Sequence, residues 1–189
     1  MAVLTRESIL HEIASGRLKI EPFSADQVGV ASVDLTLGDE IRVLEATGSP
    51  IEVQEETDYR DFTRVRRLDD PYVLRPGVTI HGITRESIQL PPDLCGFLEG
   101  RSRFARLGLM IHVTSSFVQP GVRNRQVLEM SNVSSEPLRS PWYHSPTALC
   151  IINLSSVFSV FCIISINTTN FFIIKYIEQS SSRGAYYQL

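Results

Sequence analysis

Short runs of β character, separated by proline and glycine, place the strongest limit on how this chain can fold. The run 31–38, Ala-Ser-Val-Asp-Leu-Thr-Leu-Gly, alternates apolar and polar residues with a period of two, as in a strand with one buried face. Further runs of this kind cover 41–44, 72–74, 78–83 and 87–90. They lie roughly ten residues apart and end at turns such as Pro91-Pro92, which predicts a mostly β sandwich or barrel.

One short helix is expected before the first strand. Thr5 is placed to cap its N-terminus, and Ile9, Leu10 and Ile13 form one apolar face. Gly16 is placed to end it. The segment 46–71 that follows the first strands is polar and rich in turn residues, so we expect an exposed excursion with a solvated surface.

Composition limits the partners of the chain. The 189 residues suit one domain, with 43% hydrophobic residues, 21% charged residues and a net charge of −3. This balance gives no general reason to expect a nucleic acid or a membrane as partner. The cysteines form neither a disulfide framework nor a zinc pair, and the first residues form no signal peptide; the cysteines are Cys95, Cys150 and Cys162. A cytoplasmic protein is therefore expected.

The stretch 95–132 carries the residues with the clearest chemistry. Arg101, Arg103 and Arg106 surround the hydroxyl of Ser102, and cations beside a hydroxyl predict a phosphate site. Residues 102–107 can form one or two helical turns, which would place Ser102 and Arg106 on one face. Free backbone N–H groups in the first turn would also suit an anion.

Two strands are expected after this helix, at 109–114 and 125–130, joined across the turn Gln119-Pro-Gly121. Glu129 is a carboxylate inside the second, otherwise apolar run, which suggests a base. Each residue also has a structural alternative. Glu129 can be an ordinary outward-facing strand residue, Ser102 a helix cap and the arginines a solvated face, and we interpret His112 as a structural core histidine.

The last fifty residues differ in character from the rest. From residue 140 to residue 174 there is no aspartate, glutamate, lysine or arginine. Three interpretations are open: a transmembrane helix at 147–167, buried strands that complete the β fold, or a segment foreign to the domain that arises from a reading-frame slip or retained intron. We favour the third, for a reason given below.

Taken together, the motifs resemble those of the dCTP deaminase family, in the dUTPase-like superfamily. The resemblance covers roughly residues 1–139. It rests on three central motifs: Gly100-Arg-Ser-Arg-Phe-Ala-Arg-Leu-Gly-Leu-Met-Ile-His-Val-Thr114, Gln119-Pro-Gly121 and Gln126-Val-Leu-Glu-Met-Ser-Asn132. Earlier motifs agree: Ile20-Glu-Pro-Phe23, the run 31–38 and Ile88-Gln-Leu-Pro-Pro-Asp-Leu94. We therefore expect a deaminase-like domain at 1–139 and an atypical tail at 140–189.

This resemblance implies a fold and a reaction. The implied fold is mainly β, a distorted β-barrel or jelly roll with short helices, here with an aberrant C-terminal part. The family forms homotrimers with sites at the subunit interfaces and hydrolyses dCTP to dUTP and ammonia. Magnesium rides on the triphosphate and no zinc is used. The sequence agrees, because the His-x-Glu and Pro-Cys-x-x-Cys motifs of zinc deaminases are absent.

The resemblance also assigns roles to residues. Glu129 matches the catalytic glutamate, which takes a proton from the water that attacks C4 and passes one to the leaving amine. Ser102 would position the water or the base, and Arg106 would orient the carboxylate or balance its charge. The expected substrate-binding residues, which include backbone groups of the second strand, are Arg101, Arg103, Gln119, Val127 and Leu128.

Some positions depart from the family pattern. Gln119 stands where aspartate is common; it can hydrogen-bond the sugar but cannot act as a base, which argues against a dUTP diphosphatase or a bifunctional dUMP-forming enzyme. Arg103 replaces a frequent second serine, and Phe117 a commonly polar or basic residue. Ser140-Pro-Trp-Tyr-His144 stands where a peptide like Ser-Pro-Gly-Ile-Thr is expected, which suggests a frameshift near residue 140. A non-catalytic nucleotide-binding homologue is the alternative function.

Overall fold

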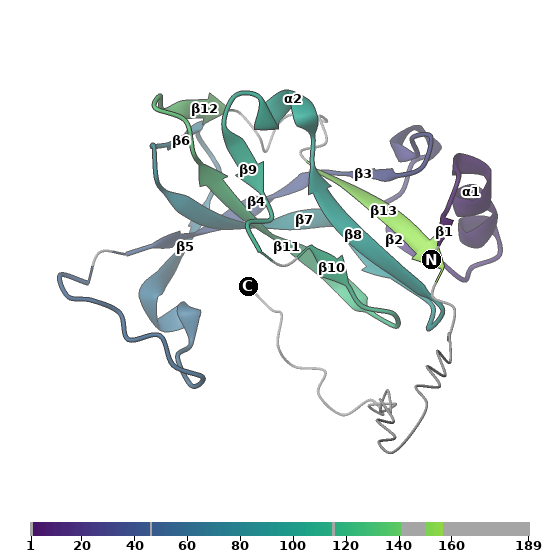
Figure 1. The fold of residues 1–189 in the computed structure, drawn as a ribbon, viewed down its shortest axis with the longest axis horizontal. Coiled ribbons are helices and arrows are strands. Elements are labelled where there is room, and N and C mark those ends of the chain that lie inside the picture. Colours follow the sequence, from purple (N-terminus) through teal and green to yellow (C-terminus); the bar gives the residue numbers. More distant parts are fainter. Residues whose placement is uncertain (1, 46, 115, 141–149, 157–189) are drawn as a thin grey trace, which may run out of the picture.

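The computed structural model describes residues 2–45, 47–114, 116–140 and 150–156, and these are mostly β (Figure 1). Their strands form a five-stranded sheet, a six-stranded sheet and a two-stranded sheet. The expectation of a mainly β fold with short helices is confirmed. The described strands are not closed into a barrel, so the architecture is open sheets packed on one another.

The five-stranded sheet is entirely antiparallel and has β13 at its centre. Its strands are β1 (Ala2–Val3), β3 (Val33–Leu35), β8 (Leu94–Gly100), β10 (Phe117–Val118) and β13 (Cys150–Ser156). β13 pairs with β8 along its whole length and on its other edge with β1 and β3. β10 closes the far side of β8.

The six-stranded sheet is also antiparallel, in the order β5-β4-β7-β11-β9, with β2 paired to β7. Its strands are β2 (Lys19–Glu21), β4 (Leu37–Leu44), β5 (Thr63–Arg67), β7 (Thr79–Gln89), β9 (Leu109–Ile111) and β11 (Arg123–Asn132). A small third sheet pairs β6 (Tyr72–Leu74) with β12 (Leu138–Ser140). Apolar faces of all three sheets contribute to one core cluster, whose central side chains are fully buried, among them Ile41, Leu74, Leu128 and Ile152.

The helices are short, as expected. Helix α1 (Arg6–Ala14) begins after Thr5, whose hydroxyl accepts a hydrogen bond from the Ser8 N–H, and it buries Ile9. Gly16 follows at φ 74°, a left-handed conformation that suits glycine, so the predicted start and end are confirmed. The other helical segments are η1 (Ala25–Gln27), η2 (Tyr59–Phe62) and α2 (Ser102–Ala105).

The structure divides one predicted strand and joins two others. The run 31–38 becomes β3 and β4, because the Thr36 N–H and hydroxyl donate to the buried Glu86 carboxylate at 2.9 and 2.7 Å instead of continuing one ladder. The runs 78–83 and 87–90 form the single strand β7. The strand expected at 109–114 ends at Ile111, since His112 adopts φ 62°.

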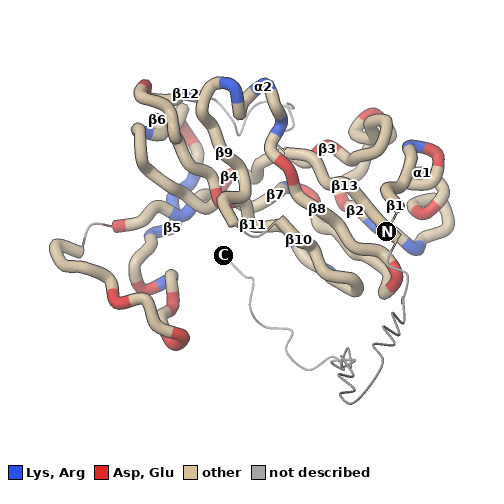
Figure 2. The backbone as a smooth tube through the Cα atoms, viewed as in Figure 1, with Lys and Arg blue, Asp and Glu red and all other residues tan. Residues whose placement is uncertain are grey.

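The excursion at 46–71 is mainly exposed where it is described, as expected. Arg64 and Arg67 on β5 form ion pairs of 2.8 Å with Glu45 and Asp39, so two basic residues of this edge are paired with acidic ones. Figure 2 marks the basic and acidic positions along the backbone of this part of the chain. Tyr59 is half-buried, and its ring packs on the six-stranded sheet, where it contacts His81. This contact matters for the site described below.

The described part of the tail is a strand of the core. In β13 the side chains of Cys150, Ile152 and Leu154 have no exposed surface, which confirms the buried-strand interpretation for residues 150–156. No helix in the part of the chain that the structure describes is long and apolar enough to cross a membrane. Residues 141–149 and 157–189 lie outside the described residues, so the frameshift near residue 140 stays a hypothesis.

Two neighbouring isoleucines test whether β13 stabilises the domain. Ile152→Ala should lower the free energy of unfolding by about 2–5 kcal/mol, because it leaves a cavity between the sheets. Ile151→Ala, on the half-buried face of the same strand, should cost about half of that or less. Urea denaturation measures both. Equal, small effects would show that β13 does not pack as described.

Candidate active site

Helix α2 gathers the predicted arginines and serine at the end of β8 (Figure 1). Arg101 occupies the N-cap position, Ser102 the first helical position and Arg106 the residue after the helix. The capping interpretation of Ser102 is therefore wrong. The side chains of Ser102, Arg103 and Arg106 are exposed, so hydroxyl and guanidinium groups are available to a ligand on this surface.

Arg101 differs from the other arginines because it is partly engaged within the chain. Its guanidinium donates to the Asp34 carboxylate of β3 at 3.0 Å, and both side chains are mostly buried. The guanidinium of Arg103 instead lies 5.5 Å from the centre of the Phe104 ring. The ion pair fixes the start of α2 against the five-stranded sheet, while the other donors of Arg101 stay available to a phosphate.

Glu129 lies on the outer face of the six-stranded sheet, half-buried. Its neighbours Leu128 and Met130 are completely buried in the core, so the alternation of β11 directs the Glu129 carboxylate away from the core. One carboxylate oxygen accepts two long hydrogen bonds from Thr114, 3.3 Å from its N–H and 3.4 Å from its hydroxyl. The carboxylate is thus held at the turn that follows β9.

A row of polar side chains crosses the sheet at Glu129. Glu129 of β11 is the direct antiparallel partner of His81 on β7, which in turn is the partner of Arg42 on β4. The Tyr59 ring contacts His81 edge-on at 5.6 Å, and the Arg42 guanidinium lies 5.8 Å from the centre of the same ring. Sequence reasoning missed His81, Arg42 and Tyr59, because only the strand register brings them together.

Two histidines flank Glu129, and both have a lowered pKa. Burial is the main cause at His81 and at His112, and the Glu129 carboxylate opposes it in both cases. Arg42 lowers the pKa of His81 further. His112 is half-buried at a turn, and its backbone N–H donates to the backbone carbonyl of Glu129 at 2.8 Å. The neutral form of both imidazoles is therefore favoured at pH 7, and the interpretation of His112 as a structural core histidine stays a prediction.

The remaining predicted residues lie on β10 and β11. Gln119 is exposed directly after β10. The Leu128 side chain is buried in the core and cannot line a site, so only its backbone could meet a ligand. β9 pairs with β11 only over Met130–Asn132, which leaves that edge of β11 uncovered by β9 at Val127 and Leu128. The expectation that backbone groups there contact the base therefore stays a prediction.

The structure joins some of the predicted residues and separates others. Arg101, Ser102, Arg103 and Arg106 share one helix and its flanks. In the part of the chain described, no hydrogen bond or ion pair links any of them to Glu129, whose carboxylate accepts its hydrogen bonds from Thr114. We call the group of residues at α2 the basic half-site, and Glu129 with Thr114 the acidic half-site.

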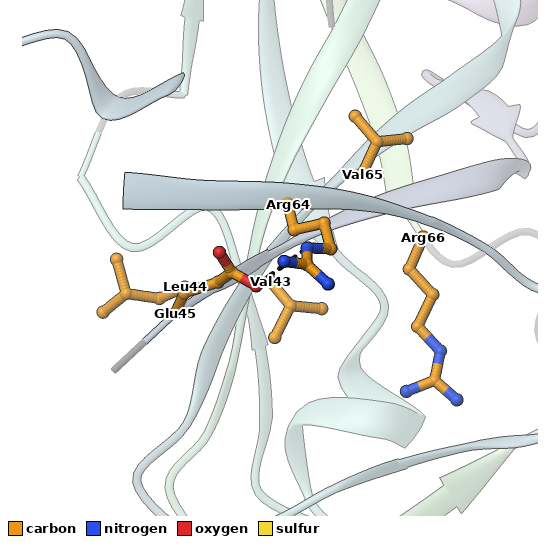
Figure 3. Close-up of a pocket in the computed structure, with 6 residues that line it drawn as sticks. All are labelled: Val43, Leu44, Glu45, Arg64, Val65 and Arg66. Carbon is orange, nitrogen blue, oxygen red and sulfur yellow. Dashed lines mark ion pairs between the residues drawn. The ribbon is translucent and has the colours of Figure 1, made fainter. Parts of the chain in front are cut away.

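An open hollow elsewhere on the sheet contains none of the predicted site residues. It lies between β4 and β5 and is lined by Val43, Leu44, Glu45, Arg64, Val65 and Arg66 (Figure 3). The Arg64–Glu45 ion pair spans part of it, as the dashed line shows. Among the described residues, no group of three or more histidine, cysteine, aspartate or glutamate side chains is placed to hold a metal ion. The predicted site residues therefore lie outside this hollow, on α2 and its flanks, directly after β10 and on β11.

Gly108 fixes α2 relative to β9, and its substitution tests that placement. It adopts φ 87°, and an added Cβ would lie 2.6 Å from the Ser134 Cβ. Gly108→Ala should lower the free energy of unfolding by about 3 kcal/mol, from backbone strain and the clash together. Gly77→Ala is the matched control, with φ 73° but open space around the new methyl group, and should cost about 1 kcal/mol. Equal losses would contradict the close packing.

Comparisons with known proteins identify the family. The model of the dCTP deaminase-like family matches residues 3–140, close to the range of the sequence resemblance. A protein of Acidothermus cellulolyticus named dCTP deaminase, dUMP-forming is 35% identical over 156 residues, covering 82% of this chain and 81% of its own. A Rhodococcus jostii protein of the same name is 37% identical over 159 residues, covering 82% of each.

A solved structure agrees with the fold. The crystal structure of 2'-deoxycytidine 5'-triphosphate deaminase from Agrobacterium tumefaciens matches with a TM-score of 0.60 at 23% identity. The match covers 82% of this chain and 48% of that one, so this chain spans about half of the length of the solved protein. At this identity the likeness concerns the fold alone. From the family match and the two relatives together, the chain belongs to the dCTP deaminase-like family.

Proposed function

We propose that this protein deaminates dCTP to dUTP and ammonia, with Glu129 as the base. The observation that carries the proposal is the position of Glu129: a half-buried carboxylate on a sheet face, held by Thr114, within the segment that matches the family. The names of the relatives support the substrate, since each names dCTP deaminase activity. The reaction is hydrolysis of the exocyclic C–N bond of cytosine.

The proposed chemistry needs one group that both accepts and donates a proton. Glu129 takes a proton from water as the water oxygen bonds to C4 of the cytosine ring. The resulting tetrahedral centre then loses ammonia, and Glu129 supplies the proton that the departing amine requires. Thr114 orients the carboxylate through its two donors. Zinc has no part in this proposal, because the carboxylate activates the water.

The basic half-site suits the triphosphate. Arg103 and Arg106 are exposed at α2, and Arg101 retains donors beyond those bound to Asp34. Magnesium would arrive with the triphosphate and reduce its negative charge. Ser102 would hold the water or the base, and Arg106 would balance the charge of the catalytic carboxylate. These residues thus bind and orient, while Glu129 transfers the proton.

We also infer a homotrimer in which each site combines two chains. The absence of a direct link between α2 and Glu129 within one described chain supports this inference, because Ser102 and Arg106 need to reach the carboxylate to serve it. The resemblance in sequence implies the same arrangement. One chain would supply Glu129 and its neighbour would supply α2.

A second candidate reaction is formation of dUMP, favoured by the names of the relatives. Such an enzyme hydrolyses the triphosphate after deamination and needs a second activated water. Gln119 carries an amide where the family commonly has aspartate, and an amide is no base. Incubation with dCTP and Mg²⁺, followed by separation of dUTP, dUMP and dCTP, distinguishes the products. Unchanged dCTP with retained nucleotide binding would instead support the non-catalytic homologue.

Glu129→Gln tests the proposed base. The amide keeps the size of the side chain but cannot take a proton, so kcat should fall by about 10²–10⁴-fold while dCTP binding changes little. Turnover is measured by ammonia release and binding by calorimetry. Glu99→Gln, an exposed carboxylate on β8, is the control and should behave as the wild type. Wild-type turnover in Glu129→Gln would refute the role of this carboxylate.

Mixing two inactive variants tests whether sites are shared between chains. Glu129→Gln and Arg106→Ala chains, co-expressed with different tags, should regain activity in mixed trimers. In random assembly about a quarter of the shared sites combine an intact Glu129 with an intact Arg106. Homotrimers of either variant contain no such site and are removed by purification through both tags. Each mixed trimer then has one intact site in three and should show about a third of wild-type activity. Inactive mixed oligomers would mean that each site lies within one chain.

A further inference from the structure

His81 is the direct cross-strand partner of Glu129, yet the proposed reaction gives it no role. The two residues are direct partners in the antiparallel pair of β7 and β11, so both side chains lie on the same face of the sheet. Directly opposed residues have Cβ atoms about 4.5–5.5 Å apart. An imidazole beside a catalytic carboxylate is therefore in a position to affect its proton affinity.

Two side chains hold the imidazole from the other side. Tyr59 comes from the excursion at 46–71 and packs edge-on against the His81 ring, with 85° between the ring planes. Arg42 is the partner of His81 on β4, and its guanidinium donates to the Thr63 hydroxyl at 3.3 Å. The Arg42 Nε is buried and has no hydrogen-bond partner in the described chain, so a cation stands close to His81 without a carboxylate to neutralise it.

We propose that His81 is a positioning residue for Glu129, and that Arg42 and Tyr59 keep its imidazole fixed and uncharged beside the carboxylate. The proposal rests on the proposed function, because it assumes that Glu129 acts as the base. The charged and titratable groups facing His81 are Arg42 from β4, Tyr59 from η2 and Glu129 from β11.

An uncharged imidazole preserves the basicity of Glu129. A protonated His81 would form an ion pair with the carboxylate and stabilise its anion, which weakens it as a base. Burial and Arg42 lower the pKa of His81, while Glu129 raises it. Arg42 thus opposes protonation of His81, so that no imidazolium stabilises the Glu129 anion and the carboxylate keeps the basicity that it needs to take a proton from water.

The first test follows the titration of His81 by NMR and does not depend on turnover. Glu129→Gln removes the group that raises the pKa of His81, so that pKa should fall further. Arg42→Gln removes a group that lowers it, so the pKa should rise. The His11 imidazole on α1 supplies a reference signal. A titration of His81 that neither substitution moves would overturn the proposal.

The second test measures the pH dependence of kcat/KM. In Arg42→Gln, His81 gains a proton more readily, so the acid limb should move to higher pH by about half a unit or more. His81→Asn keeps a neutral polar side chain and should retain most of kcat at neutral pH, whereas His81→Leu should lose about tenfold. In the double variant Arg42→Gln/His81→Asn, the acid limb of the kcat/KM profile should lie at the same pH as in the single variant His81→Asn.

Controls separate this role from a loss of structure. Gln89→Leu introduces leucine at the far end of the same strand and should leave the pH profile unchanged. A purely structural effect of Arg42→Gln would lower activity at every pH and persist in the double variant, which would overturn the proposal. Failure of the proposed function is distinct: wild-type protein would then release no ammonia from dCTP, whatever the titration of His81.

Discussion

The antiparallel pairing of β7 with β11 is the constraint on which both the core and the site depend. It places Leu128 opposite Gly82 and Glu129 opposite His81, so one face fills the core and the other carries the chemistry. Gly82 permits this packing, because a Cβ there would collide with the side chains of Leu37 and Met130. A slip of one residue would bury the Glu129 carboxylate and expose leucine. The pairing is continuous from Val127 to Ser131, the segment that contains both residues, and the register shift lies before it, between Arg125 and Val127.

A second constraint connects the two large sheets. The Glu86 carboxylate, nearly fully buried, accepts hydrogen bonds from Thr36 and from the Gln27 side-chain amide. Because Thr36 bonds to Glu86, the chain leaves the β3 ladder there and begins β4 with the next residue. β3 can therefore join β13 in one sheet while β4 joins β7 in the other. Asp34 of β3 then meets Arg101 before α2. The buried Glu86 carboxylate on β7 thus helps to place the basic half-site.

Local signals in the sequence were sufficient for α1 and for the β character of most strands, while the site roles of Ser102 and Glu129 stay predictions. Thr5 and Gly16 bound α1 as expected, and the motif around Ser102 and Glu129 agreed with the range matched by the family. Long-range pairing could not be predicted from single residues. The break at Thr36 depends on Glu86, fifty residues later, and the row through His81 depends on the register of neighbouring strands. The strand β13 was not the favoured interpretation of its segment, because the segment shows no clear alternation and Ser140-Pro-Trp-Tyr-His144 departs from the family pattern.

The position of β13 explains why the tail matters to the proposed activity. Helix α2 begins directly after β8, and β13 is the strand that pairs with β8 over its full length. Cys150 is opposite Gly100, at the end of β8 from which the chain enters α2. The same strand holds β3 on its other edge, and β3 provides the Asp34 that binds Arg101. β8 and β3, the two strands that position the basic half-site, are therefore both paired to the seven residues of β13. The arginines depend on β13 for their position even though no residue of β13 is expected to touch the nucleotide.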